Sequence, residues 1–144
     1  MNERIIALDI GDARIGVAVS DASRLIATPI DTIYRIGYGP DVRKGGESCQ
    51  RYDTTQVLSG WPLNMDGTEG ERAAKSRKLA KTVELWSGLP VRMWDERQTT
   101  CAAADLLDES GTYGSRRKEI LDSVSATVIL EDYLAWRKEH PGEM

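Results

Sequence analysis

The chain opens with two apolar runs that alternate with the period of a β-strand. In residues 4–10 every second side chain shares a face, and one face carries Ile5, Ala7 and Asp9. Residues 14–20 repeat this pattern after a short turn that contains glycine and aspartate. The short gap predicts that the two strands form an antiparallel hairpin.

Three further strands and a long connection are expected. Residues 25–35 favour a weak strand at a sheet edge, because Pro29 has no backbone N–H to donate. Residues 36–53 are rich in glycine, and we expect a mobile loop with at most a short helix. Whether this loop faces substrate or only connects elements stays open. The runs at residues 55–60 and 91–94 are typical of buried strands.

A helix is predicted between the fourth and fifth strands. Thr68 and Glu71 have the spacing of a capping box, in which each side chain accepts a hydrogen bond from the first turn. Small and apolar residues follow at helical spacing. Gly88 and Pro90 are expected to end the helix.

Two more helices are expected after the fifth strand. One begins at Thr99 or Thr100 and stops at Gly111. The other is opened by a basic loop at residues 116–118 and runs to about Arg137.

The order of these elements predicts one α/β domain over residues 1–144. The fourth and fifth strands are each followed by a helix, so they should run parallel through a right-handed crossover. No repeat, low-complexity segment or linker divides the chain.

Composition narrows the class of protein. The 144 residues are 40% hydrophobic and 29% charged, which is ordinary for a globular domain. No apolar run approaches the roughly 20 residues of a membrane span, and no export signal is visible. Cys49 and Cys101 have no metal or redox spacing, so we expect a cytoplasmic protein with two unpaired thiols. A net charge of −4 counts mildly against nucleic-acid binding, although bound cations would bring positive charge.

A single histidine, His140, lies in a polar tail. A Ser-His or Cys-His nucleophilic site therefore has no candidate base, and a zinc site of His and Cys is equally poorly supplied. Any chemistry must rest on carboxylates, with help from Arg, Lys or Tyr. Carboxylates favour hard cations such as Mg²⁺ or Mn²⁺.

Three carboxylates stand where other residue types would be expected. Asp9 interrupts an apolar strand, and Asp122 begins the apolar stripe of the last helix. Glu96 follows the fifth strand, at the end where open α/β sheets place their ligands.

Each of these acids also has a structural explanation when it is taken alone. Asp9 could accept hydrogen bonds in the hairpin turn, Asp122 could favour the helix dipole, and Glu96 could pair with Arg14 or Arg97. Taken together these explanations weaken, because three carboxylates at one sheet edge repel one another. Bound divalent cations would relieve the repulsion, and two such ions can drive the hydrolysis of a phosphodiester.

The same residues carry a resemblance to a known family. Residues 7–11 and 14–21 are similar to the opening of the YqgF family, whose members are also described as RuvC-like Holliday-junction-resolvase homologues or pre-16S rRNA nucleases. Three more motifs agree in order: residues 62–70, then Asp95-Glu96-Arg97 with Thr99-Thr100, then Asp122 with Ser125-Ala126.

The resemblance implies an RNase H-like fold, a mixed five-stranded sheet flanked by helices. It also implies that Asp9, Glu96 and Asp122 are the catalytic residues and hold the metal, and that bacterial members act in 5′-end maturation of 16S rRNA. Two positions depart from the family pattern. Trp61 stands where a smaller aliphatic residue is expected, and Gln98 where leucine is usual.

Basic and polar residues near the acids are candidate substrate contacts. The arginines could contact phosphate oxygens or serve only in ion pairs. The basic run before the last helix could meet a phosphate backbone or remain a solvated loop. The asparagine and the threonine could instead shape a turn and cap a helix. The candidates are Arg14, Asn64, Arg97, Thr99, Arg116, Arg117 and Lys118.

These features favour a metal-dependent endonuclease that acts on structured RNA, with ribosomal precursor particles as partners and branched DNA as a possible substrate. A Holliday junction resolvase is an alternative, and it would need a symmetric dimer; the pattern fits a monomer or a dimer. A non-catalytic RNA- or ribosome-associated module is another, and it would bind without metal and without cleavage. A sugar-kinase type of phosphotransferase needs a second nucleotide-binding half, which 144 residues do not supply.

Overall fold

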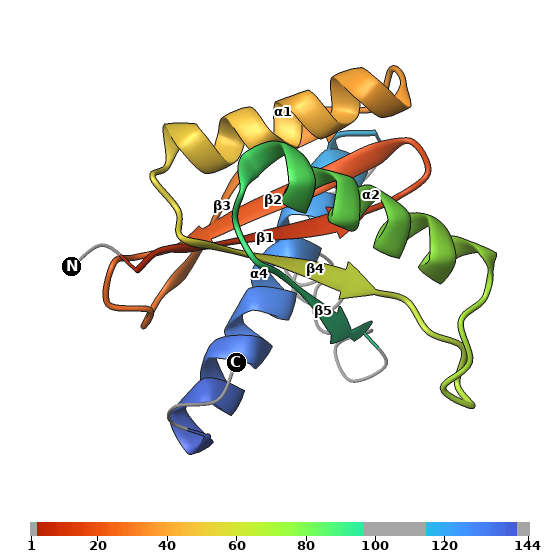
Figure 1. The fold of residues 1–144 in the computed structure, drawn as a ribbon. Helices are drawn as coiled ribbons and strands as arrows, with labels where there is room; N and C mark the ends of the chain where they lie inside the picture. Colours follow the sequence, from red (N-terminus) through yellow and green to blue (C-terminus); the bar gives the residue numbers. More distant parts are fainter. Residues whose placement is uncertain (1–2, 97–114, 141–144) are drawn as a thin grey trace.

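A computed structural model describes residues 3–96 and 115–140, and the side chains of residues 3–96 and 124–140. Five strands form one mixed sheet in the order β3-β2-β1-β4-β5 (Figure 1). β1 pairs antiparallel with β2 and parallel with β4, and β4 pairs parallel with β5. This arrangement confirms the expected mixed sheet. The strands are β1 (Ile5–Ile10), β2 (Arg14–Ser20), β3 (Ala27–Tyr34), β4 (Gln56–Trp61) and β5 (Val91–Asp95).

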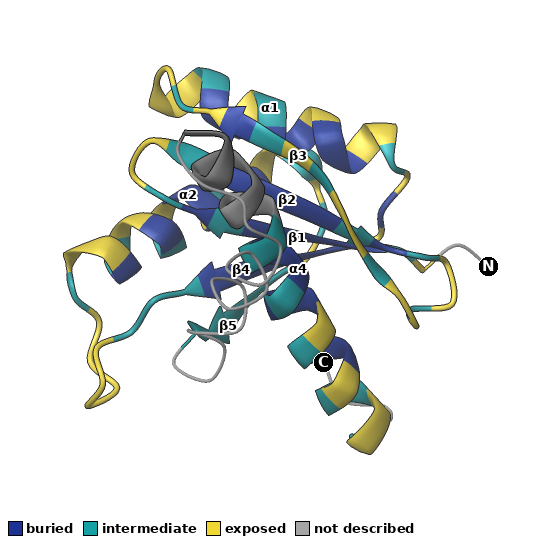
Figure 2. Cartoon of the chain, turned by 180° about the vertical axis from the view of Figure 1, so that it is seen from behind, coloured by how far each residue is buried: buried dark blue, intermediate teal, exposed yellow. Residues whose placement is uncertain are grey.

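Helices cover both faces of the sheet. α1 (Tyr38–Arg51) and α2 (Glu71–Ser87) lie on one face, and α4 (Ser115–Glu139) crosses the other (Figures 1 and 2). The alternation of β1 divides its side chains between two cores. One core lies beneath α1 and α2 and includes Ile6, Leu8, Val57, Leu79 and Val83. The other lies beneath α4 and includes Ile5, Ala7, Leu58, Ile129 and Tyr133.

Helix α1 occupies most of the segment expected to be a loop, so that expectation is wrong. The glycines that argued against a helix lie where α1 packs against α2. A Cβ on Gly46 would stand 2.0 Å from Cε3 of Trp86, and one on Gly45 would stand 3.6 Å from Val83. Close packing of the two helices therefore requires small residues, and tertiary contacts override the low helix propensity of glycine.

The third strand is an edge strand, as expected, and it accommodates its proline with a bulge. Its register shifts between Val17, which pairs with Asp31, and Ala18, which pairs with Pro29. The intervening residue of β3 is the extra residue of the bulge. The ladder therefore tolerates the missing N–H at the edge.

Helix α2 is confirmed, but the capping box is wrong. The helix begins at Glu71, and its N-cap is Gly70, with no side-chain capping hydrogen bond. Thr68 instead donates its hydroxyl to Asp66 Oδ1 at 2.6 Å, inside the preceding loop. The helix ends at Ser87, and the predicted terminator Gly88 is its C-cap, with a left-handed φ of 74°.

Three parallel strands end together and form the edge that positions the site. β1, β4 and β5 run in the same direction, so their C-terminal ends meet at what we name the carboxyl edge. The last residues of these strands are Ile10, Trp61 and Asp95. Within the described ranges, no helix is both long enough and apolar enough to cross a bilayer.

Candidate active site

Asp9 and Glu96 meet at the carboxyl edge, on the face covered by α4. Asp9 follows Ala7 on the α4 side of β1, and Glu96 comes directly after β5. The two carboxyl groups are within hydrogen-bonding distance of each other. The structure therefore brings together two of the three acids that the sequence singled out.

The pair is partly buried, and this changes how Glu96 ionises. Burial raises the pKa of Glu96 to about 8, and the charge of Asp9 and the hydrogen bond to it act in the same direction. The charge of Asp95 adds to this rise, while that of Arg72 opposes it. At neutral pH the pair therefore holds one proton between the two acids, as expected when like charges share a buried site.

Asp9 presents a second oxygen to the interior. Its Oδ1 is buried and accepts no hydrogen bond from the described part of the chain, although the carboxyl group itself interacts with Glu96. Asp9 does not accept a hydrogen bond from the Gly11 N–H of the hairpin turn, because that N–H donates to the Arg14 carbonyl at 2.9 Å. The carboxylate oxygens of Asp9 and Glu96 are ligands of the kind that a hard divalent cation prefers.

Gly60, near the end of β4, leaves the space that the Glu96 carboxyl group occupies. A Cβ at this position would lie 2.8 Å from Glu96 Cδ and 3.0 Å from its Oε2. It would also lie 2.9 Å from Cδ1 of Ile129 in α4. We did not identify Gly60 from the sequence, although a glycine inside a buried strand is a known sign of close approach.

Arg72 is a second residue that sequence reasoning missed. It lies in the first turn of α2, and its positive charge lowers the pKa of Glu96. A cation in the first turn of a helix opposes the helix dipole. That unfavourable placement is the signal that could have identified it.

Asp122 lies in α4, four residues before Ala126, and its side chain is outside the described part of the chain. The apolar stripe predicted to follow it is confirmed, because Ala126, Ile129 and Tyr133 are buried. A position near Asp9 remains a prediction for Asp122.

The structure describes only the backbone of some of the remaining candidate residues, and others lie outside the described residues. Arg116, Arg117 and Lys118 belong to α4, which begins at Ser115, so the expected basic loop is wrong. Their side chains are not described. Arg97 and Thr99, like the helix expected from Thr99 or Thr100 to Gly111, lie outside the described residues.

Asn64 lies in the loop between β4 and α2, which extends away from the body of the protein (Figure 1). Its backbone N–H donates to the Thr68 carbonyl at 2.9 Å, and its side-chain Nδ2 donates to Thr68 Oγ1 at 3.0 Å. The side-chain amide therefore shapes the loop, and substrate contact remains a prediction for this residue.

Arg14 begins β2, next to the hairpin turn, and substrate contact remains a prediction for this residue too.

Trp61, which departs from the family pattern, closes the same loop. Its Nε1 donates to Glu69 Oε2 at 3.0 Å. Glu69 also accepts two hydrogen bonds from Arg77, at 2.8 and 2.9 Å. The tryptophan thus connects the end of β4 to the base of the loop and to α2.

Comparisons of sequence agree with this geometry. The family model RuvX, described as Holliday junction resolvase, matches residues 3–136. A protein of Myxococcus xanthus named "Putative pre-16S rRNA nuclease" is 42% identical over 91% of this chain and 87% of its own length. A protein of the same name from Clostridium kluyveri is 40% identical over 91% and 96%. The family resemblance found in the sequence is confirmed.

Solved structures share the fold at low sequence identity. RuvC of Thermus thermophilus, in complex with a Holliday junction substrate, has a TM-score of 0.59 at 16% identity and covers 94% of this chain and 96% of that one. The fowlpox virus Holliday junction resolvase has a TM-score of 0.57 at 14% identity, with coverage of 92% and 99%. The expected RNase H-like fold is confirmed.

Proposed function

We propose that this chain, which belongs to the RuvX family of nucleases, hydrolyses phosphodiester bonds of structured RNA with divalent cations held by Asp9, Glu96 and Asp122. Relatives at 40% and 42% identity are named pre-16S rRNA nucleases. The proposed substrate is therefore the 5′ region of precursor 16S rRNA, met on ribosomal precursor particles in the cytoplasm.

The observation that carries the proposal is the meeting of the Asp9 and Glu96 carboxyl groups at the carboxyl edge, with one Asp9 oxygen buried. Asp9 of β1 and Glu96, which follows β5, meet in a partly buried place, where burial and the charge of Asp9 raise the pKa of Glu96 to about 8. Such a pair can lose its proton at neutral pH when positive charge arrives. Carboxylate oxygens are the ligands that Mg²⁺ and Mn²⁺ prefer, so the donor set fits these ions.

The chain's own residues supply position and charge. Asp9 on β1 and Glu96 at the end of β5 are held by the paired strands of a rigid sheet. Gly60 leaves room for the Glu96 carboxyl group, and Arg72 offsets part of its charge. Divalent cations at these carboxylates would neutralise charge on the scissile phosphate and favour ionisation of the attacking water.

A cleavage assay with a matched control tests the proposal. End-labelled precursor 16S rRNA is incubated with Mg²⁺ or Mn²⁺ and either the parent chain, Asp9→Asn or Asp31→Asn. Asp31 is an exposed residue of the edge strand β3. We expect Asp9→Asn to lower the rate by about 10³-fold, because it removes an electrostatic element of the site, while Asp31→Asn keeps the parent rate. Equal rates for Asp9→Asn and the parent chain would contradict the proposal.

Cleavage of branched DNA is a second candidate, favoured by the description of the family as Holliday junction resolvases. A synthetic four-way junction is included in the same assay. Symmetric cuts in the junction, with no cleavage of the RNA, would favour this candidate, and the active species should then be a dimer. Metal-independent binding of RNA without any product would instead indicate a non-catalytic module.

A further inference from the structure

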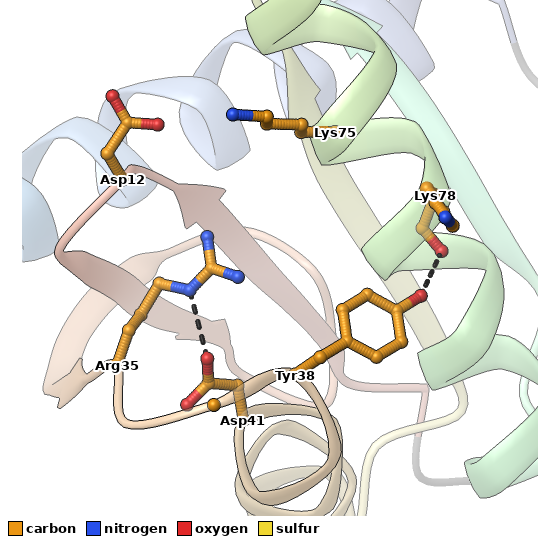
Figure 3. Close-up of a pocket in the computed structure, with 7 residues that line it drawn as sticks. Asp12, Arg35, Tyr38, Asp41, Lys75 and Lys78 are labelled. Carbon is orange, nitrogen blue, oxygen red and sulfur yellow. Dashed lines mark hydrogen bonds and ion pairs between the residues drawn. The ribbon is translucent and has the colours of Figure 1, made fainter.

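A second polar site lies at the carboxyl edge, on the sheet face opposite to the Asp9–Glu96 pair. It is a cleft of about 640 Å³ between the β1–β2 turn, the start of α1 and the N-terminal half of α2 (Figure 3). The charged and hydroxyl-bearing residues that line it are Asp12, Arg35, Tyr38, Asp41, Lys75 and Lys78.

Arg35 is held in a fixed orientation at the floor of this cleft. Its Nε donates to Asp41 Oδ2 at 3.0 Å, and its Nη1 donates to the Gly11 carbonyl at 2.9 Å. The Asp41 side chain is fully buried and also accepts the Ile36 N–H at 3.0 Å. Within the described residues Nη2 has no hydrogen-bond partner, and the guanidinium group points into the opening (Figure 3). An arginine oriented in this way suits a phosphate group.

Two lysines of α2 complete the positive lining. Lys75 and Lys78 are three residues apart, so they share one face of the helix. Lys75 pairs only with Glu71 among the described residues, and that carboxylate is 84% exposed, so water screens the pair. Lys78 forms no ion pair within the described ranges, while the Tyr38 hydroxyl donates to its carbonyl oxygen at 3.1 Å.

The balance of charge favours an anion over a cation. Asp41 is matched by Arg35, which leaves the two lysines and the exposed Asp12 among the charged lining residues. Glu71, the ion-pair partner of Lys75, does not line the cleft and is largely exposed to water. The cleft therefore keeps a net positive charge. Tyr38 fixes the start of α1 against α2, so the lining residues are already in place before a ligand arrives.

We propose that this cleft binds a phosphate group of the same nucleic-acid strand whose scissile bond lies at Asp9 and Glu96. The inference rests on the proposed function and extends it to a second contact. The end of β1 separates the two sites, since Asp9 belongs to one and the Gly11 carbonyl anchors Arg35 in the other. A strand that crosses the carboxyl edge beside β1 would meet both. Such a contact adds affinity and register without reading the bases.

The test compares two double variants of equal net charge in the full-length chain. Lys75→Gln/Lys78→Gln removes the lysines of the cleft, while Lys81→Gln/Lys138→Gln removes exposed lysines that do not line it. Binding of a fluorescent precursor 16S rRNA fragment is followed by anisotropy in EDTA over a range of salt concentrations. We expect the cleft variant to bind about tenfold more weakly and its salt slope to fall by about 1 to 2. The control should keep the parent values.

A second readout separates this inference from the proposed function. At saturating RNA the cleft variant should cleave at a rate within about twofold of the parent, because only binding is weakened. Weaker RNA binding by the cleft variant supports phosphate binding in the cleft even if Asp9→Asn still cleaves RNA. Affinity and salt slope equal to those of the control variant would overturn the proposal. RNA binding that stays intact when a free nucleoside monophosphate is added as a competitor would also overturn it.

Discussion

Asp41 is buried and Glu96 is partly buried, both at the carboxyl edge, and their surroundings move their pKa values in opposite directions. Burial alone would raise the pKa of Asp41, but the Ile36 N–H and the Arg35 guanidinium group outweigh it and lower that pKa below its ordinary value. Burial also acts on Glu96, where the neighbouring Asp9 raises the pKa further, to about 8.

The difference in pKa separates an acid that stabilises the fold, Asp41, from the candidate site residue Glu96. Asp41 receives its counter-charge from its own chain, so it stabilises the fold and orients Arg35. Glu96 faces another acid, and the partial compensation by Arg72 leaves its pKa raised. A buried acid left with a raised pKa is a typical mark of a site that awaits an external charge.

The largest expected effect comes from the residue that gives the Glu96 carboxyl group its space. Gly60→Ala places a Cβ within 2.8 Å of Glu96 Cδ, so the carboxyl group must move. We expect cleavage to fall by about 10²-fold, since a displacement of about 1 Å can cost that much. Steady-state kinetics should show the loss in kcat.

A second substitution separates crowding of the core from displacement of the acid. Ile129→Val, added to Gly60→Ala, relieves the contact of 2.9 Å with the α4 side chain but not the contact with Glu96. Stability should recover in part while activity stays low. Full recovery of activity would show that Glu96 had not been displaced.

The next effect concerns the structural acid. Asp41→Asn weakens the hydrogen bonds to Arg35 and Ile36, and we expect it to lower the free energy of unfolding by about 2–3 kcal/mol at neutral pH. Because the folded-state pKa of Asp41 is lowered, its contribution is present above the ordinary aspartate pKa and is lost as pH falls through the folded value. Thermal unfolding monitored by circular dichroism at pH 7 and pH 3 checks both points.

Glu47→Gln provides the comparison for this measurement, because Glu47 is an exposed residue of the same helix with an ion pair of 3.9 Å. It should change stability by less than about 0.5 kcal/mol. An Asp41→Asn protein as stable as Glu47→Gln at pH 7 would remove the contrast between the two buried acids.

The smallest expected effect has the opposite sign. In metal-free protein Glu96→Gln should raise the free energy of unfolding by about 1–3 kcal/mol at alkaline pH, because it removes a charge from a buried pair. The folded-state pKa of Glu96 is raised, so its protonated form favours the fold below the ordinary pKa of 4.5, and this contribution is lost as pH rises toward about 8.

Urea unfolding in EDTA at pH 5 and pH 9 measures this difference. The parent chain should lose stability between the two values relative to Glu96→Gln. Addition of Mn²⁺ at the higher pH should reverse the order, because binding stabilises only the chain that keeps both acids. A variant that is less stable than the parent in EDTA at pH 9 would refute the idea of repulsion at this site.

Much of the fold follows from local patterns, and the exceptions have physical causes. Asp9 stood out because it interrupts an apolar strand, and the parallel crossover followed from the alternation of strands and helices. Helix α1 was hidden because its buried stripe consists mainly of small and polar residues, including Asp41, Gly45 and Gly46. Their burial depends on α2, which no local pattern reveals.

The candidate site shows the same division between local and distant information. Glu96 and Asp9 were identified by their positions relative to strands, but the roles of Gly60 and Arg72 depend on contacts across the sheet edge. The cleft is hidden for the same reason, because Arg35 and Lys75 are far apart in sequence and meet only in the fold.

The central claim is that the acid pair at the carboxyl edge holds a divalent cation, and a crystal structure of the protein soaked in Mn²⁺ tests it most directly. The account predicts an anomalous peak in contact with carboxylate oxygens of both Asp9 and Glu96, at about 2.1 Å, with Asp122 as a further ligand. Mn²⁺-soaked crystals with no anomalous peak between the carboxyl groups of Asp9 and Glu96 would contradict the account.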